Sequence, residues 1–69
     1  MTEKVPEPEV LAFEAACVNA SVTPTQVFKK AGLHTSLWWR WRSGDVSPTL
    51  KSLRAAREAL PQVARADAA

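Results

Sequence analysis

Residues 23–44 read TPTQVFKKAGLHTSLWWRWRSG, and this stretch carries the clearest folding signals in the chain. Thr23 is followed by Pro24 and then by Gln26, which is the pattern of a capping box with proline at the first helical position. Gly32 is expected to end this helix, because glycine readily adopts the left-handed conformation found at helix C-termini. The stretch therefore predicts a helix of about two turns between Thr23 and Gly32.

A second helical pattern begins at His34 or Thr35 and ends before Gly44, after a very short connection. Two short helices joined in this way have the spacing of a helix-turn-helix. Apolar side chains of the second helix fall on one face, which we expect to be buried: Leu37, Trp38 and Trp41. The opposite face carries Ser36, Trp39, Arg40 and Ser43, with Thr35 and Arg42 along its edges.

The flanking sequence predicts two further helices. One spans about Pro8–Ala20 and turns an apolar stripe inward, made of Val10, Phe13 and Cys17. The other is expected to start at Pro48 with Ser47 as its N-cap, and to end or kink near Pro61. Its inner stripe is predicted to be Leu50, Leu53, Ala56 and Leu60.

These patterns predict an all-α fold, a compact bundle of four to five short helices that contains a helix-turn-helix. A chain of 69 residues has room for one domain. We expect it over residues 8–61, between an extended N-terminal segment, 1–7, and a short C-terminal turn and frayed tail, 62–69. No apolar run resembles a signal peptide or a membrane span, so the expected location is the cytoplasm.

Catalytic and metal chemistry have few suitable residues in this sequence. One histidine and one cysteine cannot complete a four-ligand zinc site, and Cys17 has no partner for a disulfide. Four of the seven carboxylates lie in residues 1–14, in and before the first predicted helix. We therefore expect no enzyme activity, no catalytic residue, no metal and no cofactor.

Charge is distributed unevenly along the chain. Residues 1–14 hold four glutamates against one lysine, a net charge of −3, whereas residues 29–54 hold six basic residues against one aspartate, a net charge of +5. This pattern favours a polyanionic partner, with an ordinary solvated face as the alternative. On DNA, Arg40 could bind guanine with two hydrogen bonds, and the hydroxyls of Thr35 and Ser36 could pair with either type of base.

Trp39 points about 100° away from Trp38 on the same helix and cannot share its buried face. It could contact a DNA sugar or a thymine methyl group, or join a dimer interface. It could instead pack its ring over Arg42 or the end of the last helix. Thr35 has the alternative role of a helix N-cap.

The stretch from Thr23 to Leu60 resembles the lambda-repressor and Cro-like, or XRE-type, helix-turn-helix family. The resemblance rests on three segments: Ala31-Gly32-Leu33, Leu37-Trp38-Trp39-Arg40-Trp41-Arg42-Ser43-Gly44, and Ser47-Pro48-Thr49-Leu50 with Leu53. It implies a sequence-specific regulator that binds double-stranded DNA, such as a Cro-like repressor of a phage, prophage or mobile element acting on a palindromic operator.

By position, the resemblance implies base contacts at Thr35, Ser36 and Arg40, with Trp39 beside them. It implies phosphate contacts around Ser43 and Gly44, to which we add Thr25, Gln26, Lys29, Arg42 and Lys51 as candidates. The chain departs from the family pattern at two positions. Pro24 stands where the family commonly has a phosphate-clamping glutamine, and Phe28 stands where it usually has a small residue.

Two other interpretations stay open. Arg40-Trp41 also resembles the DNA-reading helix of MerR-like and excisionase-like modules, which continue into a β-hairpin. The same fold could instead serve as a protein-binding module, such as a phage-encoded inhibitor or adaptor of a host factor. Homodimerisation through the last helix or the tail, in solution or only on DNA, is a further open alternative.

Overall fold

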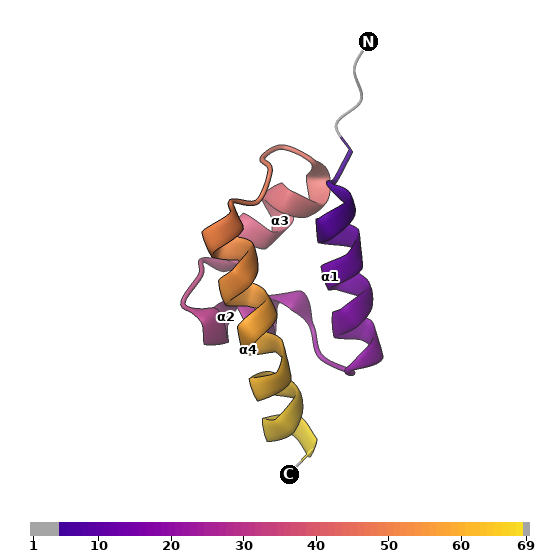
Figure 1. The fold of residues 1–69 in the computed structure, drawn as a ribbon, viewed down its shortest axis with the longest axis vertical. Helices are drawn as coiled ribbons and strands as arrows, with labels where there is room; N and C mark the ends of the chain where they lie inside the picture. The colour runs from indigo at the N-terminus through magenta and orange to yellow at the C-terminus, as the bar shows by residue number, and fades with distance from the viewer. Residues whose placement is uncertain (1–4, 69) are drawn as a thin grey trace.

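A computed structural model of the protein describes residues 5–68, with side chains described as far as Ala66 (Figure 1). These residues form four helices and no strand: α1 Pro8–Asn19, α2 Pro24–Ala31, α3 Thr35–Ser43 and α4 Leu50–Ala68. The predicted all-α bundle is confirmed. Residues 1–4 of the predicted N-terminal segment and Ala69 of the predicted tail lie outside the described residues.

The other three helices pack around α2. It makes its most extensive contacts with α4 and then with α3, whereas α1 packs against both α2 and α3. In Figure 1, α1 and α4 run down the long axis, and α3 lies near the end at which both of them begin. Over the described residues, α1 and α4 make hardly any direct contact with each other.

The centre of the core is a cluster of four aromatic rings from three helices. Phe13 of α1 and Phe28 of α2 both lie edge-on to Trp38 of α3, with ring centroids 5.8 Å and 5.9 Å apart. The ring centroids of Phe28 and Trp41 are 4.9 Å apart. Edge-to-face packing adds to the stabilisation from burial. All four side chains are at most 2% exposed, which confirms the predicted inward face of α3.

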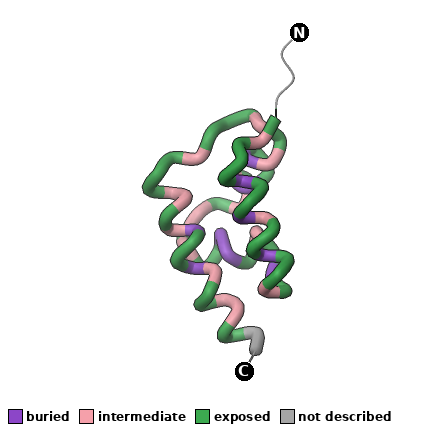
Figure 2. The backbone as a smooth tube through the Cα atoms, turned by 45° about the vertical axis from the view of Figure 1, so that its right-hand side comes forward, coloured by how far each residue is buried: buried purple, intermediate pink, exposed green. Residues whose placement is uncertain are grey.

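The inner stripe of α1 is also confirmed, since Val10, Phe13 and Cys17 are all buried. Figure 2 shows the buried positions gathered on the sides of the helices that face one another. Burial raises the pKa of the Cys17 thiol to about 11, and the carboxylate of Glu14 adds to the shift. The thiol therefore stays protonated near neutral pH and serves as a small core residue.

Both ends of α2 match the sequence prediction. The Thr23 hydroxyl accepts a hydrogen bond from the Gln26 N–H at 3.2 Å, and the Gln26 side chain accepts one from the Thr23 N–H at 2.9 Å. Gly32 has the left-handed conformation, with φ of 77°. The capping box and the glycine stop are thus confirmed.

The predicted start of α4 is wrong by two residues. The helix begins at Leu50, and Thr49 is its cap, because the Thr49 Oγ1 accepts a hydrogen bond from the Ser52 N–H at 3.1 Å. The Ser47 hydroxyl, predicted to be the N-cap, instead donates a 3.0 Å hydrogen bond to Glu7. It ties the segment before α4 to the start of α1.

Leu50 was predicted to face the core, but 70% of it is exposed. The rest of the predicted stripe does face inward, with Ala56 buried and Leu53 and Leu60 partly buried against the core. Leu50 differs because the neighbour on its side is the first turn of α1, which hardly contacts α4.

The predicted helix end near Pro61 is also wrong, because α4 continues through Pro61 to Ala68. A proline inside a helix removes one backbone hydrogen bond and usually costs about 3 kcal/mol. Val63 and Ala64, two and three residues further along, are packed against the core, and this packing holds the helix together beyond the proline.

Candidate nucleic-acid interface

The buried tryptophans fix the rotation of α3 and so decide which side chains face outward. Trp39 is 62% exposed, as its predicted position requires. Exposed side chains at matching spacing lie beside it, and we call the set the outer face of α3: Ser36, Trp39, Arg40 and Ser43. Thr35, in the first turn, is partly buried. A large aromatic ring and a guanidinium therefore stand side by side on a helix anchored from behind.

The first turn of α3 is capped by His34, and not by Thr35. The His34 Nδ1 accepts a hydrogen bond from the Ser36 N–H at 3.2 Å and lies 2.7 Å from the Ser36 hydroxyl. Sequence reasoning missed this contact, because histidine is an uncommon helix cap. The contact holds the Ser36 hydroxyl in one place at the N-terminus of α3.

At the other end of α3, Gly44 has a left-handed conformation with φ of 81°. A Cβ atom placed on it would lie 2.7 Å from the backbone of Val5, so the N-terminal segment passes directly against this residue. The Ser43 hydroxyl donates to the Arg40 carbonyl oxygen at 3.1 Å. Of the two predicted phosphate contacts here, Ser43 is exposed, whereas Gly44 is covered on one side.

Arg42 lies on a different side of α3 from the outer face. Its Nε donates to both carboxylate oxygens of Glu14 on α1, at 3.0 Å and 3.2 Å. This ion pair joins α3 to α1 and offsets the charge of Arg42. A half-exposed pair of this kind stabilises the fold by only about 0–1 kcal/mol.

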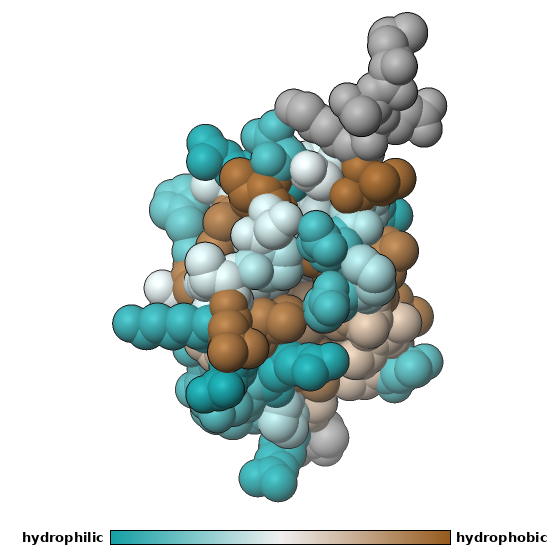
Figure 3. All heavy atoms as spheres, turned by 45° about the horizontal axis from the view of Figure 1, so that its top comes forward, coloured by the Kyte–Doolittle hydropathy of each residue, from teal (hydrophilic) through white to brown (hydrophobic). Residues whose placement is uncertain are grey.

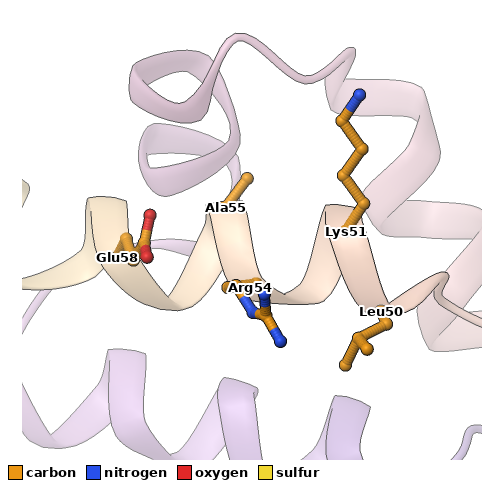
Figure 4. Close-up of a pocket in the computed structure, with 5 residues that line it drawn as sticks. All are labelled: Leu50, Lys51, Arg54, Ala55 and Glu58. Atoms are coloured by element: carbon orange, nitrogen blue, oxygen red, sulfur yellow. The ribbon is translucent and has the colours of Figure 1, made fainter.

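Other predicted phosphate contacts come from α2 and α4. Lys29 is exposed in the last turn of α2, beside Lys30, which the sequence-based site did not include. Lys51 is exposed in the first turn of α4, and Figure 4 shows it extending toward the side where α2 and α3 lie. Each of these helices thus presents an exposed ammonium group.

The predicted contacts at the start of α2 are occupied within the chain. Gln26 completes the capping box, and the Thr25 hydroxyl shares a 3.1 Å hydrogen bond with the Thr23 hydroxyl. A phosphate contact from either side chain would compete with the cap. The exposed lysines of α2 are better placed for that role.

Among the described residues, no cluster of histidine, cysteine or carboxylate side chains could hold a metal ion. The described helices also include none that is long and apolar enough to cross a membrane. In Figure 3, the apolar atoms on the visible face form separate patches between hydrophilic side chains.

Comparison with known proteins gives no match. No protein-family model fits the chain, and no curated protein or solved structure is significantly similar to it. The residues of this chain are therefore the sole basis for a functional proposal.

Proposed function

We propose that the protein binds double-stranded DNA at specific sequences and regulates transcription, most simply by occluding a promoter. The observation that carries the proposal is the outer face of α3. Trp39 and Arg40 project from a short helix whose opposite side is held in the core by Trp38 and Trp41. The major groove of DNA admits one α-helix, and a reading helix must keep a fixed orientation to discriminate between bases.

In this proposal Arg40 is the main base-reading residue, because guanidinium binds the two acceptors of guanine at once. Ser36 and Thr35 lie in the first turn of α3, the part of a reading helix that usually enters the groove most deeply. Trp39 stands beside Arg40 and would contact a sugar or a thymine methyl group. The exposed ammonium groups of Lys29, Lys30 and Lys51 would bind phosphates.

Selection from a random duplex library is the experiment that tests the proposal. We expect one family of sequences to be enriched, with log affinity falling against log salt at about −0.9 per neutralised phosphate. Arg40→Ala should lose about 1–3 kcal/mol of discrimination at one base pair. Lys51→Ala is the matched control and should weaken binding to all sequences alike. A protein that binds no selected duplex more tightly than random duplex would contradict the proposal.

The second candidate is a protein-binding module, and the exposure of Trp39 is the observation that favours it. Tryptophan and arginine side by side on a surface are typical of the residues that dominate protein interfaces. This candidate predicts that Trp39→Ala abolishes capture of a protein partner while the salt-dependent affinity for duplex DNA is absent in every variant. The MerR-like alternative gains no support, since the chain after α3 forms α4 and not a β-hairpin.

A further inference from the structure

A shallow groove runs between the first three turns of α4 and the start of α1, and we call it the α1–α4 groove. It consists of a hollow of about 420 Å³ between the start of α1 and the start of α4, and an adjoining hollow of about 340 Å³ along α4; Leu50 lines both. Its apolar floor is formed by Pro48, Leu50 and Leu53. The groove is separate from the outer face of α3.

Leu50 is the most unusual residue of this groove, because 70% of a large apolar side chain faces solvent. Figure 4 shows Leu50 and Arg54 pointing to the side of α4 on which α1 lies, away from Lys51. A single exposed leucine is common on protein surfaces. Here, however, it adjoins the half-buried Leu53 in a hollow, which gives an apolar partner a place to bind.

The groove carries opposite charges at its two ends. Glu7 and Glu9 line the end at the start of α1, and Arg54 and Arg57 line the end further along α4. Glu58 also lines the basic end and reduces its net charge to +1. Among the described residues, the structure shows no ion pair for either arginine or for Glu9, whereas Glu7 accepts from Ser47.

We propose that the occupant of the α1–α4 groove is a second copy of this chain, paired about a two-fold axis near Leu50. A surface with an apolar centre and opposite charges at its ends is complementary to itself after such a rotation. The two Leu50 side chains would then cover each other. Glu7 and Glu9 of each copy would face the arginines of the other.

The proposed dimer deepens the proposed function, since a two-fold axis would allow two copies of α3 to read a palindromic site. The pairing is expected to be weak. A stable interface buries about 800 Å² on each partner, which is about a sixth of the 4818 Å² surface of this small chain. The first three turns of α4 and the first turn of α1 supply a smaller area than this. The dimer should therefore be reversible and concentration-dependent.

A charge-swap experiment in the absence of DNA tests the pairing. One variant carries Arg54→Glu and Arg57→Glu, the other carries Glu7→Lys and Glu9→Lys, and circular dichroism verifies that each is helical. In sedimentation equilibrium, we expect each variant alone to dimerise about tenfold more weakly than the natural chain or worse, because like charges then meet. Mixing the two variants should restore dimerisation, since every charged contact in the mixed dimer is again complementary.

Two outcomes would overturn the pairing. One is a natural chain that keeps its monomer mass of 7.5 kDa at millimolar concentration, and the other is a mixture that associates no better than either variant alone. The failure of this inference is distinct from failure of the proposed function. A strict monomer that still selects a duplex overturns only the pairing, whereas a dimer that selects no duplex overturns only the DNA proposal.

Leu50→Ser provides a second test that leaves the charges unchanged, and Val18→Ser is its matched control. The two residues are 70% and 69% exposed, so neither substitution should affect the core. We expect Leu50→Ser to weaken dimerisation about tenfold or more and Val18→Ser to leave it unchanged. The reverse result would place the interface at the C-terminal end of α1, away from the groove, and overturn the proposal.

Discussion

Two segments of the chain share the pattern of a hydroxyl residue followed by proline, and they fold differently. At Thr23-Pro24 the hydroxyl caps α2, and the proline is the first helical residue. At Ser47-Pro48 the hydroxyl donates to Glu7 instead. The helix there begins two residues later, at Leu50.

The third residue after each hydroxyl explains the difference. Gln26 follows Thr23 at that distance and accepts the Thr23 N–H, which closes the capping box. Leu50 follows Ser47 at the same distance and has no acceptor to offer. Thr49 has Ser52 at that position, whose N–H it caps. The hydroxyl and proline alone therefore do not define a helix start, because the cap needs a partner in the first turn.

The largest expected effect separates the anchors of α3 from the exposed start of α4. Trp38→Ala or Trp41→Ala should cost about 3–5 kcal/mol, because each ring is buried among aromatic neighbours. That equals the whole stability expected of so small a domain. Leu50→Ala should cost less than about 0.5 kcal/mol. Urea titrations followed by circular dichroism would measure both.

Trp39→Ala is the control for the two buried tryptophans of α3. This variant should stay folded because the Trp39 ring is exposed. If Trp39→Ala unfolded the chain while Trp38→Ala was tolerated, the assigned rotation of α3 would be wrong by about one residue. The outer face with Ser36 and Arg40 would then have to be reassigned.

The two glycines give the next largest contrast. Gly44, between α3 and α4, is expected to be more sensitive to substitution than Gly32, between α2 and α3. Both have left-handed backbones, but a Cβ on Gly32 would meet nothing within 4 Å, whereas one on Gly44 would lie 2.7 Å from the Val5 backbone. Gly32→Ala should cost about 1–2 kcal/mol from the backbone conformation alone. Gly44→Ala should cost more, about 2–4 kcal/mol, because the N-terminal segment must also move.

Thermal unfolding of the two glycine variants measures this contrast directly. A chain that lacks residues 1–6, measured with and without Gly44→Ala, would show the source of the difference. Without Val5, the cost of Gly44→Ala should fall to that of Gly32→Ala. If it stays higher, the contact with Val5 is not its cause.

Local patterns were sufficient to predict the parts of the fold whose causes lie close together in sequence. The capping box at Thr23, the stop at Gly32 and the inward tryptophans all depend on residues within one or two turns. At Ser47 and Pro61, distant residues also contribute, in addition to the missing acceptor at Leu50. Glu7 takes the hydroxyl of Ser47, and packing of Val63 on the core carries α4 past Pro61.

The candidate site was predictable to a similar extent. Helical spacing was enough to place Trp39 and Arg40 outward, because the rotation follows from the two buried rings. It could not show that Arg42 is bound to Glu14, since that pair joins residues 28 positions apart. It also missed the His34 cap, which depends on side-chain geometry at a single turn.

The smallest expected effects concern the caps themselves and test the comparison between the two segments most directly. Thr23→Ala and Thr49→Ala should each destabilise the fold by about 1 kcal/mol, the usual cost of removing an N-cap. Ser47→Ala removes only an exposed hydrogen bond to Glu7 and should cost less than about 0.5 kcal/mol. Chemical denaturation at matched conditions resolves these differences. If Ser47→Ala were as costly as Thr49→Ala, the hydrogen bond between Ser47 and Glu7 would stabilise the fold as much as the Thr49 cap does. The two hydroxyl-proline segments would then contribute equally to stability despite their different structures.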